Sequence, residues 1–190
     1  MKSLLSAALA AFLVAALPAV AQNKSGGKDA RPAKQDMQAI QKIAQANMAE
    51  VETGKVALEK ASSGEVKKFA QHMVDDHGKM LQETQQMAQS MGMKVPAAPD
   101  AKHQAALKML QGLSGDQFDR RYMNQMVKDH EDTLKLLKKT STGAKDPDLK
   151  AAAQKAAPDV QEHLKMAKEI QSSLGGSKNG KSEKSSSKKQ

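Results

Sequence analysis

Two histidines end closely similar stretches of this sequence. The first stretch runs Phe69-Ala-Gln-His-Met-Val-Asp-Asp-His77, and the second, 53 residues later, runs Tyr122-Met-Asn-Gln-Met-Val-Lys-Asp-His130. This separation fits one helix out and one helix back, so the repeat predicts two helices that turn matching histidines toward one interior. His163, in the last helical stretch, is expected to join them.

These three histidines indicate a metal site, because imidazole and carboxylate groups suit zinc, copper, iron or nickel. Glu50 falls three residues after Asn47 and four before Gly54, on the inward stripe of the first predicted helix. The sequence therefore predicts a site for a transition-metal ion (Zn, Cu or Fe) formed by Glu50 and the three histidines. A di-iron oxidase is not expected, since such bundle sites use Glu-x-x-His pairs and valine stands three residues before each histidine.

Two other interpretations stay open. The histidines can be structural, each hydrogen-bonded at a helix interface to a carboxylate, a carbonyl or the Tyr122 hydroxyl. The methionines between residues 73 and 91 follow one helical stripe, which favours core filling in a chain with few aromatic residues. Met91-Gly92-Met93, at a helix end, is the place where a thioether site for Cu(I) or Ag(I) would fit. No serine or cysteine nucleophile motif and no phosphate-binding loop is present.

The apolar residues recur with a helical period, and no segment alternates as a strand would. Helices are expected at 36–61, 62–91, 114–140 and 146–174, with a short extra helix at 101–113 in the longer connection. Four amphipathic helices joined in this way predict an all-α four-helix bundle. Capping boxes are expected at Ser62 with Glu65 and at Ser114 with Gln117. Asp146 is expected to be the N-cap before Pro147, and Pro158 is expected to kink or split the last helix.

The ends of the chain differ from its middle. Residues 1–21 carry Lys2, an apolar run and Ala19-Val-Ala21, the pattern of a secretory signal peptide cleaved after Ala21. Residues 22–35 and 175–190 are polar and basic and are expected to be disordered, which leaves 36–174 as the bundle domain. The mature protein is expected to be periplasmic or secreted, with no further membrane segment. There is no cysteine, so no disulfide or thiolate site can form.

Nearly all of the net charge of +9 lies in the two ends, and the segment between them is close to neutral. With almost no aromatic residues and an exported destination, nucleic acid is not an expected partner. The lysine-rich ends are predicted to contact anionic envelope surfaces electrostatically. Nothing in the sequence fixes the oligomeric state.

The chain resembles a family of bacterial exported domains of unknown function that carry the label "predicted outer membrane protein". The resemblance rests on Glu50-Val-Glu-Thr-Gly54, the stretch from Val66 to His77, Phe118 to Tyr122 with His130, and Pro158 with His163-Leu164. It implies a ferritin-like, antiparallel version of the bundle and no particular activity. The leading interpretation is a non-enzymatic bundle that binds a partner or ligand in envelope maintenance or stress. The alternatives are a metal-binding protein and, third, an enzyme built on that metal.

Overall fold

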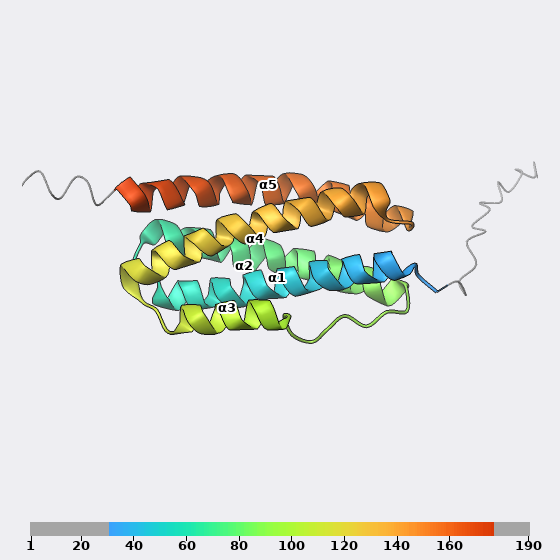
Figure 1. The fold of residues 1–190 in the computed structure, drawn as a ribbon, viewed down its shortest axis with the longest axis horizontal. Coiled ribbons are helices and arrows are strands. Elements are labelled where there is room, and N and C mark those ends of the chain that lie inside the picture. The colour runs from blue at the N-terminus through green and yellow to red at the C-terminus, as the bar shows by residue number, and fades with distance from the viewer. Residues whose placement is uncertain (1–30, 177–190) are drawn as a thin grey trace, which may run out of the picture. The chain divides into compact units, whose positions relative to one another are not determined.

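The computed structural model describes residues 31–176. The predicted signal peptide (1–21), most of the 22–35 segment and nearly all of the 175–190 tail lie outside these residues, so these assignments stay predictions. Within the described range the secondary structure consists of five helices and no strand (Figure 1). They are α1 (Lys34–Lys60), α2 (Gly64–Ser90), α3 (Ala101–Gln111), α4 (Gly115–Gly143) and α5 (Pro147–Gly176).

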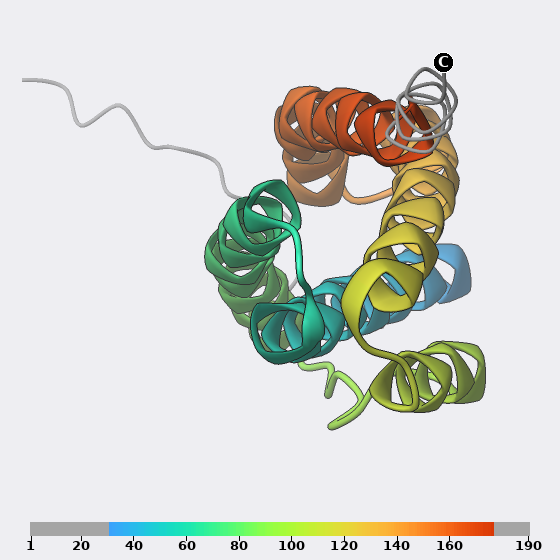
Figure 2. The same ribbon diagram turned by 90° about the vertical axis from the view of Figure 1, so that its left-hand side faces the viewer.

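The four long helices pack as two antiparallel hairpins, α1 with α2 and α4 with α5. Viewed end-on, they stand at the corners of a square, with α1 beside α4 and α2 beside α5 (Figure 2). The short helix α3 lies outside the square, against α1 and α4. The prediction of an all-α, antiparallel four-helix bundle with an extra helix between its second and third long helices is confirmed. Among the described residues, no helix is long and apolar enough to cross a membrane.

Buried carboxylates hold the two hairpin turns in equivalent ways. The Asp119 carboxylate, near the start of α4, accepts hydrogen bonds from the backbone N–H groups of Ser62 and Ser63 at 3.1 and 2.8 Å. The Asp36 carboxylate, near the start of α1, accepts from those of Lys145 and Asp146 at 3.0 and 2.8 Å. Each hairpin turn is therefore held by the first helix of the other hairpin.

Gly54 sets the close approach of α1 and α2. A Cβ at this position would lie 2.8 Å from Val74 Cγ2 and 3.1 Å from the Ala70 carbonyl oxygen. Both contacts are shorter than normal packing allows, so only glycine fits without a shift of α2. At this point α1 therefore packs closely against α2 within the chain.

The start of α2 differs from the prediction. Ser63, not Ser62, is the N-cap, and its hydroxyl accepts a long hydrogen bond of 3.5 Å from Val66 N. The Ser62 hydroxyl instead donates to the Asp119 carboxylate at 2.5 Å. The predicted capping box of Ser62 with Glu65 is therefore wrong, because a carboxylate from another helix binds Ser62.

The later helix boundaries agree better with the sequence. Ser114 is the N-cap of α4 but makes no side-chain capping bond, so its predicted capping box with Gln117 is also wrong. The predicted Asp146 cap is confirmed, since its carboxylate accepts from Leu149 N at 2.8 Å. Pro158 does not split the last helix, and α5 continues through it. A proline removes one helix hydrogen bond, and buried apolar residues on both sides of it, including Ala153 and Val160, keep α5 packed on the bundle.

Candidate metal centre

The structure brings His77 of α2, His130 of α4 and His163 of α5 together in the middle of the bundle. All three side chains are almost completely buried. His77 Nε2 lies 3.4 Å from His130 Nε2, and the three ring centroids are 5.2–5.5 Å apart. One nitrogen from each ring falls within 4.8 Å of the others, which is close enough to hold one metal ion.

Each ring has one nitrogen in a hydrogen bond to an oxygen that can only accept. His77 Nδ1 donates to Asn47 Oδ1 at 2.9 Å, and His130 Nδ1 donates to the Met126 carbonyl at 2.8 Å. His163 Nε2 donates to Asp76 Oδ2 at 3.2 Å. Because a neutral imidazole has one N–H and one lone pair, these bonds fix the tautomer of every ring.

The remaining nitrogens of the three rings carry lone pairs. His77 Nε2 and His130 Nε2 point their lone pairs at each other, so neither can donate to the other. His163 Nδ1 is buried and has no hydrogen-bond partner among the described residues. The outer hydrogen bonds thus leave one lone pair on each of three rings whose centroids lie 5.2–5.5 Å apart, and a cation held between the rings would satisfy lone pairs of this kind.

A proton is a poor candidate for that cation. Burial lowers the pKa of His130 to about 4 against the opposing effect of the Met126 carbonyl. Burial also lowers the pKa of His77 well below its ordinary value, with further contributions from His130 and His163. Burial lowers the pKa of His163 as well, although the Asp76 hydrogen bond opposes this. At neutral pH the rings are therefore neutral, which is the state that binds metals.

Glu50 is buried as predicted, but it lies behind His130. Its Oε1 is 3.7 Å from His130 Nδ1, the nitrogen that faces away from the other two rings. Its Oε2 has no hydrogen-bond partner among the described residues. Burial, with the nearby Asp129 carboxylate, raises the pKa of Glu50 well above its ordinary value. Glu50 is therefore not grouped with the three donor nitrogens, and its predicted role as a direct ligand awaits a test.

The oxygen partners expected from a structural role are present only in part. A carboxylate and a carbonyl do bind His163 and His130, but the Tyr122 hydroxyl is buried and binds none of the described residues. Tyr122 instead packs between Phe69 and Phe118. A structural role accounts for one nitrogen of each ring and leaves the other unexplained.

The methionine stripe of α2 packs in the core, as the sequence favoured. Met73 is fully buried, and Met80 and Met87 pack against buried apolar clusters. Met91 and Met93 also pack against such a cluster, beside Ile40 and Leu149. These contacts provide no thioether site at the end of α2.

Comparison with known proteins identifies the family. The model of a domain of unknown function, DUF4142, matches residues 21–170. The chain belongs to the DUF4142 family. This confirms the predicted resemblance to a family of domains of unknown function. None of the curated protein sequences is significantly similar to this chain.

Solved structures with the same fold include proteins of another domain of unknown function, DUF305. A DUF305 fragment from Deinococcus radiodurans has a TM-score of 0.67 at 15% identity, covering 77% of this chain and 99% of that one. A putative secreted DUF305 protein from Streptomyces coelicolor has a TM-score of 0.64 at 14% identity, covering 74% and 94%. CopM in its Cu(II)-bound form has a TM-score of 0.62 at 20% identity, covering 73% and 96%. At these identities the likeness shows the fold.

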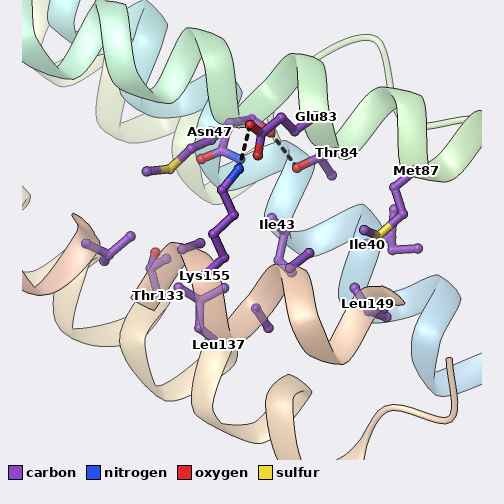
Figure 3. A pocket seen from close by; sticks show the side chains of 15 residues that line it. Ile40, Ile43, Asn47, Glu83, Thr84, Met87, Thr133, Leu137, Leu149 and Lys155 are labelled. Atoms are coloured by element: carbon purple, nitrogen blue, oxygen red, sulfur yellow. Dashed lines mark hydrogen bonds and ion pairs between the residues drawn. The ribbon is translucent and has the colours of Figure 1, made fainter. Parts of the chain in front are cut away.

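An apolar pocket lies next to the three histidines in this DUF4142 bundle. Its volume is about 190 Å³, and it is lined from α1, α2, α4 and α5 by side chains that include Ile40, Met80 and Leu137. Asn47, the partner of His77, also lines it. Figure 3 shows Lys155 of α5 reaching across to Glu83 of α2, with which it forms a 3.0 Å ion pair. Asn47 therefore belongs both to the pocket lining and to the hydrogen bonds around the three histidines.

His72 and Asp76 belong to the centre but were not identified as site residues from the sequence. His72 Nε2 lies 3.4 Å from Asp76 Oδ2, and its ring centroid is 5.1 Å from that of His163. Against the upward effect of partial burial, the His163 hydrogen bond and the nearby His72 lower the pKa of Asp76 and keep it ionised. The sequence signal for the pair was the four-residue spacing of a histidine and a carboxylate on the helix that carries His77.

Proposed function

We propose that this protein binds one transition-metal ion, copper or zinc, at His77, His130 and His163 and serves to hold or buffer that ion. The single observation behind this proposal is the set of outer hydrogen bonds. Metal-binding histidines regularly donate their second N–H to a carboxylate, a carbonyl or a similar acceptor. All three rings do so, each to a different kind of oxygen.

The spacing of the donor nitrogens supports the same conclusion. Two nitrogens bound to zinc at about 2.0–2.1 Å with a tetrahedral angle lie roughly 3.4 Å apart. His77 Nε2 and His130 Nε2 are 3.4 Å apart. In the absence of an ion, two lone pairs at this distance repel each other inside a medium of low dielectric constant. An ion converts this repulsion into two bonds.

The charges near the centre determine how a monovalent or a divalent ion would be balanced. The three donors are neutral, and the nearest ionised group is Asp76, which is hydrogen-bonded to His163. A monovalent ion such as Cu(I) would be balanced by Asp76 alone. A divalent ion such as Zn²⁺ would leave one positive charge to be balanced, for which ionisation of buried Glu50 would serve, because uncompensated buried charge is costly.

The fold is compatible with such a role. CopM, at about 20% identity, has been determined in Cu(II)-bound, Cu(I)-bound and Ag-bound forms. This supports the view that a bundle of this fold can accommodate these ions, although it says nothing about which residues bind them here. Export after cleavage at Ala21, expected from the signal-peptide pattern, would place the protein where such ions are exchanged with the environment.

The test is metal binding by the full chain produced without an affinity tag. Metal content is measured by mass spectrometry, and the metal-free protein is titrated with Zn²⁺ and, under reducing conditions, with Cu(I). We expect one equivalent to bind the wild type, His103→Gln to bind equally, and His77→Gln and His163→Gln to lose binding while circular dichroism shows them folded. His103 is the matched control because it lies on α3, pairs with the N-cap residue Asp100 and belongs to neither group of possible metal ligands.

Thermal unfolding provides a second readout. A ligand present at 100 times its Kd stabilises the folded state by about 2.7 kcal/mol, which raises the Tm of a chain of this size by roughly 5–10 °C. A chelator should reverse this rise in the wild type and have no effect on His77→Gln. Binding of no ion by the wild type and an unchanged Tm would refute the proposal.

Partner binding in envelope maintenance, the leading interpretation of the sequence, has less support from the described residues. Met109 is the one large apolar side chain among them that is strongly exposed, at 49%. Large apolar side chains on this part of the chain are therefore mostly covered or partly covered. The contact of lysine-rich ends with anionic surfaces concerns residues outside the described range and stays a prediction.

A further inference from the structure

The three-histidine centre is closed to solvent, so an ion needs a route to it. Two features lead inward from the surface. One is the apolar pocket, whose lining includes Asn47 (Figure 3). The other is a second cluster, formed by His72, Asp76 and His163, in which one ligand atom from each residue lies within 4.8 Å of the others. We call this second cluster the outer site.

The outer site runs from solvent to the centre in three steps. The side chain of His72 is 47% exposed, that of Asp76 is 27% exposed, and that of His163 is 2% exposed. Asp76 Oδ2 connects the two rings, at 3.4 Å from His72 Nε2 and 3.2 Å from His163 Nε2. An ion bound to these atoms would already be in contact with a residue of the inner centre.

A groove between α2 and α5 brings solvent to His72. Its volume is about 500 Å³, and its lining includes His72 and Phe69 from α2 and Met166 and Ile170 from α5. The carboxylates of Glu65 and Glu169 also line it. Two negative side chains near an exposed imidazole favour the approach of a cation to this groove, although Lys68 partly offsets them.

We propose that the outer site is the loading site of the metal centre: it takes the ion from solvent and passes it inward through His163. This inference rests on the proposed function. His163 can act in both places because its Nε2 faces Asp76 and His72, whereas its Nδ1 is buried without a hydrogen-bond partner. When Nε2 binds the ion, the ring proton must be on Nδ1. When Nδ1 binds the ion, the ring proton is on Nε2, and this N–H donates a hydrogen bond to Asp76.

One consequence concerns stoichiometry. The ring keeps the same single proton in both states, so His163 offers one lone pair at a time. The outer and inner sites therefore cannot both use a neutral His163, and the protein should hold one tightly bound ion rather than two.

The apolar pocket is the less favourable route. A cation that enters it leaves water and meets mainly side chains such as Ile43, Met80 and Leu149, which cannot replace the lost hydration. The outer site offers nitrogen and oxygen ligands at each step. The route with ligands is the one that a metal ion should follow.

The experiment is a stopped-flow measurement of Co²⁺ uptake by the metal-free full chain, followed by the visible absorbance of the bound ion. His72→Ala should slow uptake by about tenfold or more, the size of effect typical for loss of a supporting residue at a metal site. Its equilibrium affinity should fall by much less than its rate of uptake, because the three inner histidines and the Asp76 partner of His163 are intact. His103→Ala is the matched histidine control and should change neither quantity. Ala156→Leu, which fills part of the apolar pocket, should also leave the rate unchanged.

The outcomes separate the loading role from the proposed function. A wild type that binds neither Co²⁺ nor the Zn²⁺ and Cu(I) of the titration described above refutes the proposed function. Uptake at the same rate in His72→Ala refutes the loading role alone. A loss of affinity that matches the loss of rate would make His72 a ligand of the final site, and slow uptake in Ala156→Leu but not in His72→Ala would make the pocket the route. Either result overturns the inference.

Discussion

Mild acid should destabilise the metal-free bundle, and His130 should account for a large part of the effect. Burial lowers the pKa of His130 from 6.5 to about 4. A base whose pKa is lower in the folded state is neutral there while the unfolded chain takes up a proton, so stability is complete above pH 6.5 and falls as the pH drops toward 4. His77 acts in the same direction, because burial also lowers its pKa.

The size of the effect follows from the shift. At 1.36 kcal/mol per pKa unit, the whole interval is worth about 3 kcal/mol for His130, and about 2 kcal/mol of this falls between pH 7 and pH 5. That is a large share of the 5–15 kcal/mol typical of a folded domain. Of the titratable groups facing His130 from the other helices, His77 and His163 add to the loss. Glu50 opposes it, because its pKa is raised and acid relieves the penalty of its buried charge.

The assay is urea unfolding of the metal-free protein at pH 7 and pH 5, followed by circular dichroism. With a urea m-value of 1–3 kcal/mol/M, a loss of about 2 kcal/mol moves the midpoint down by roughly 1 M. His130→Gln should remove most of the His130 share of this shift, and the partly exposed control His103→Gln should keep it. If His130→Gln and the wild type lose the same stability between the two pH values, the ring is not held neutral by burial and the reasoning fails.

Five further substitutions test separate parts of the structure. Asn47→Leu removes the outer partner of His77 and should weaken metal binding by about 10- to 100-fold in a competition titration; unchanged affinity would contradict the tautomer argument. Glu50→Gln should keep Cu(I) affinity within a few-fold, whereas a direct ligand would show the larger loss. Gly54→Ala should destabilise the bundle by about 1–3 kcal/mol through its clash with α2, while Gly78→Ala, which meets open space on α2, should stabilise it by up to about 1 kcal/mol; urea unfolding of both variants decides the sign. Asp119→Asn should cost about 2–3 kcal/mol in the same assay, and a loss under 0.5 kcal/mol would mean that solvent replaces the bonds to the turn.

The helices could be predicted from the sequence because their apolar stripes and turn residues are local signals. The repeat around His77 and His130 also predicted a long-range contact, which the structure confirms. The two helices are not a hairpin pair, however: α2 and α4 stand at opposite corners of the square, and the two histidines meet in its centre. The residue at which α2 begins could not be predicted from local sequence signals. The choice between Ser62 and Ser63 as N-cap depends on Asp119, which lies on another helix.

For the candidate centre, the sequence predicted which face of each helix turns inward, but not how the side chains on that face contact one another. The inward stripe correctly placed Glu50 in the interior, but a stripe does not say which side of a neighbouring ring a side chain occupies. His72 stands five residues before His77, about 140° around the helix, so its position indicated solvent. Its place in the centre depends on Asp76, which reaches from His72 to His163 on α5, and this contact between helices has no signature in either segment alone.

The two halves of the repeat differ in the contacts of the aspartate that precedes each histidine. Asp76 and Asp129 occupy the same place in the repeat, one residue before the histidine, yet Asp76 binds His163 and Asp129 faces Glu50, His103 and Lys102 on the other side of the bundle. If the histidines served packing alone, equal partners for both halves would satisfy them equally well. Three buried rings with unsatisfied lone pairs instead lower the stability of the metal-free bundle. A bound ion would offset this cost, so the arrangement that weakens the empty protein is the one that makes it a metal site.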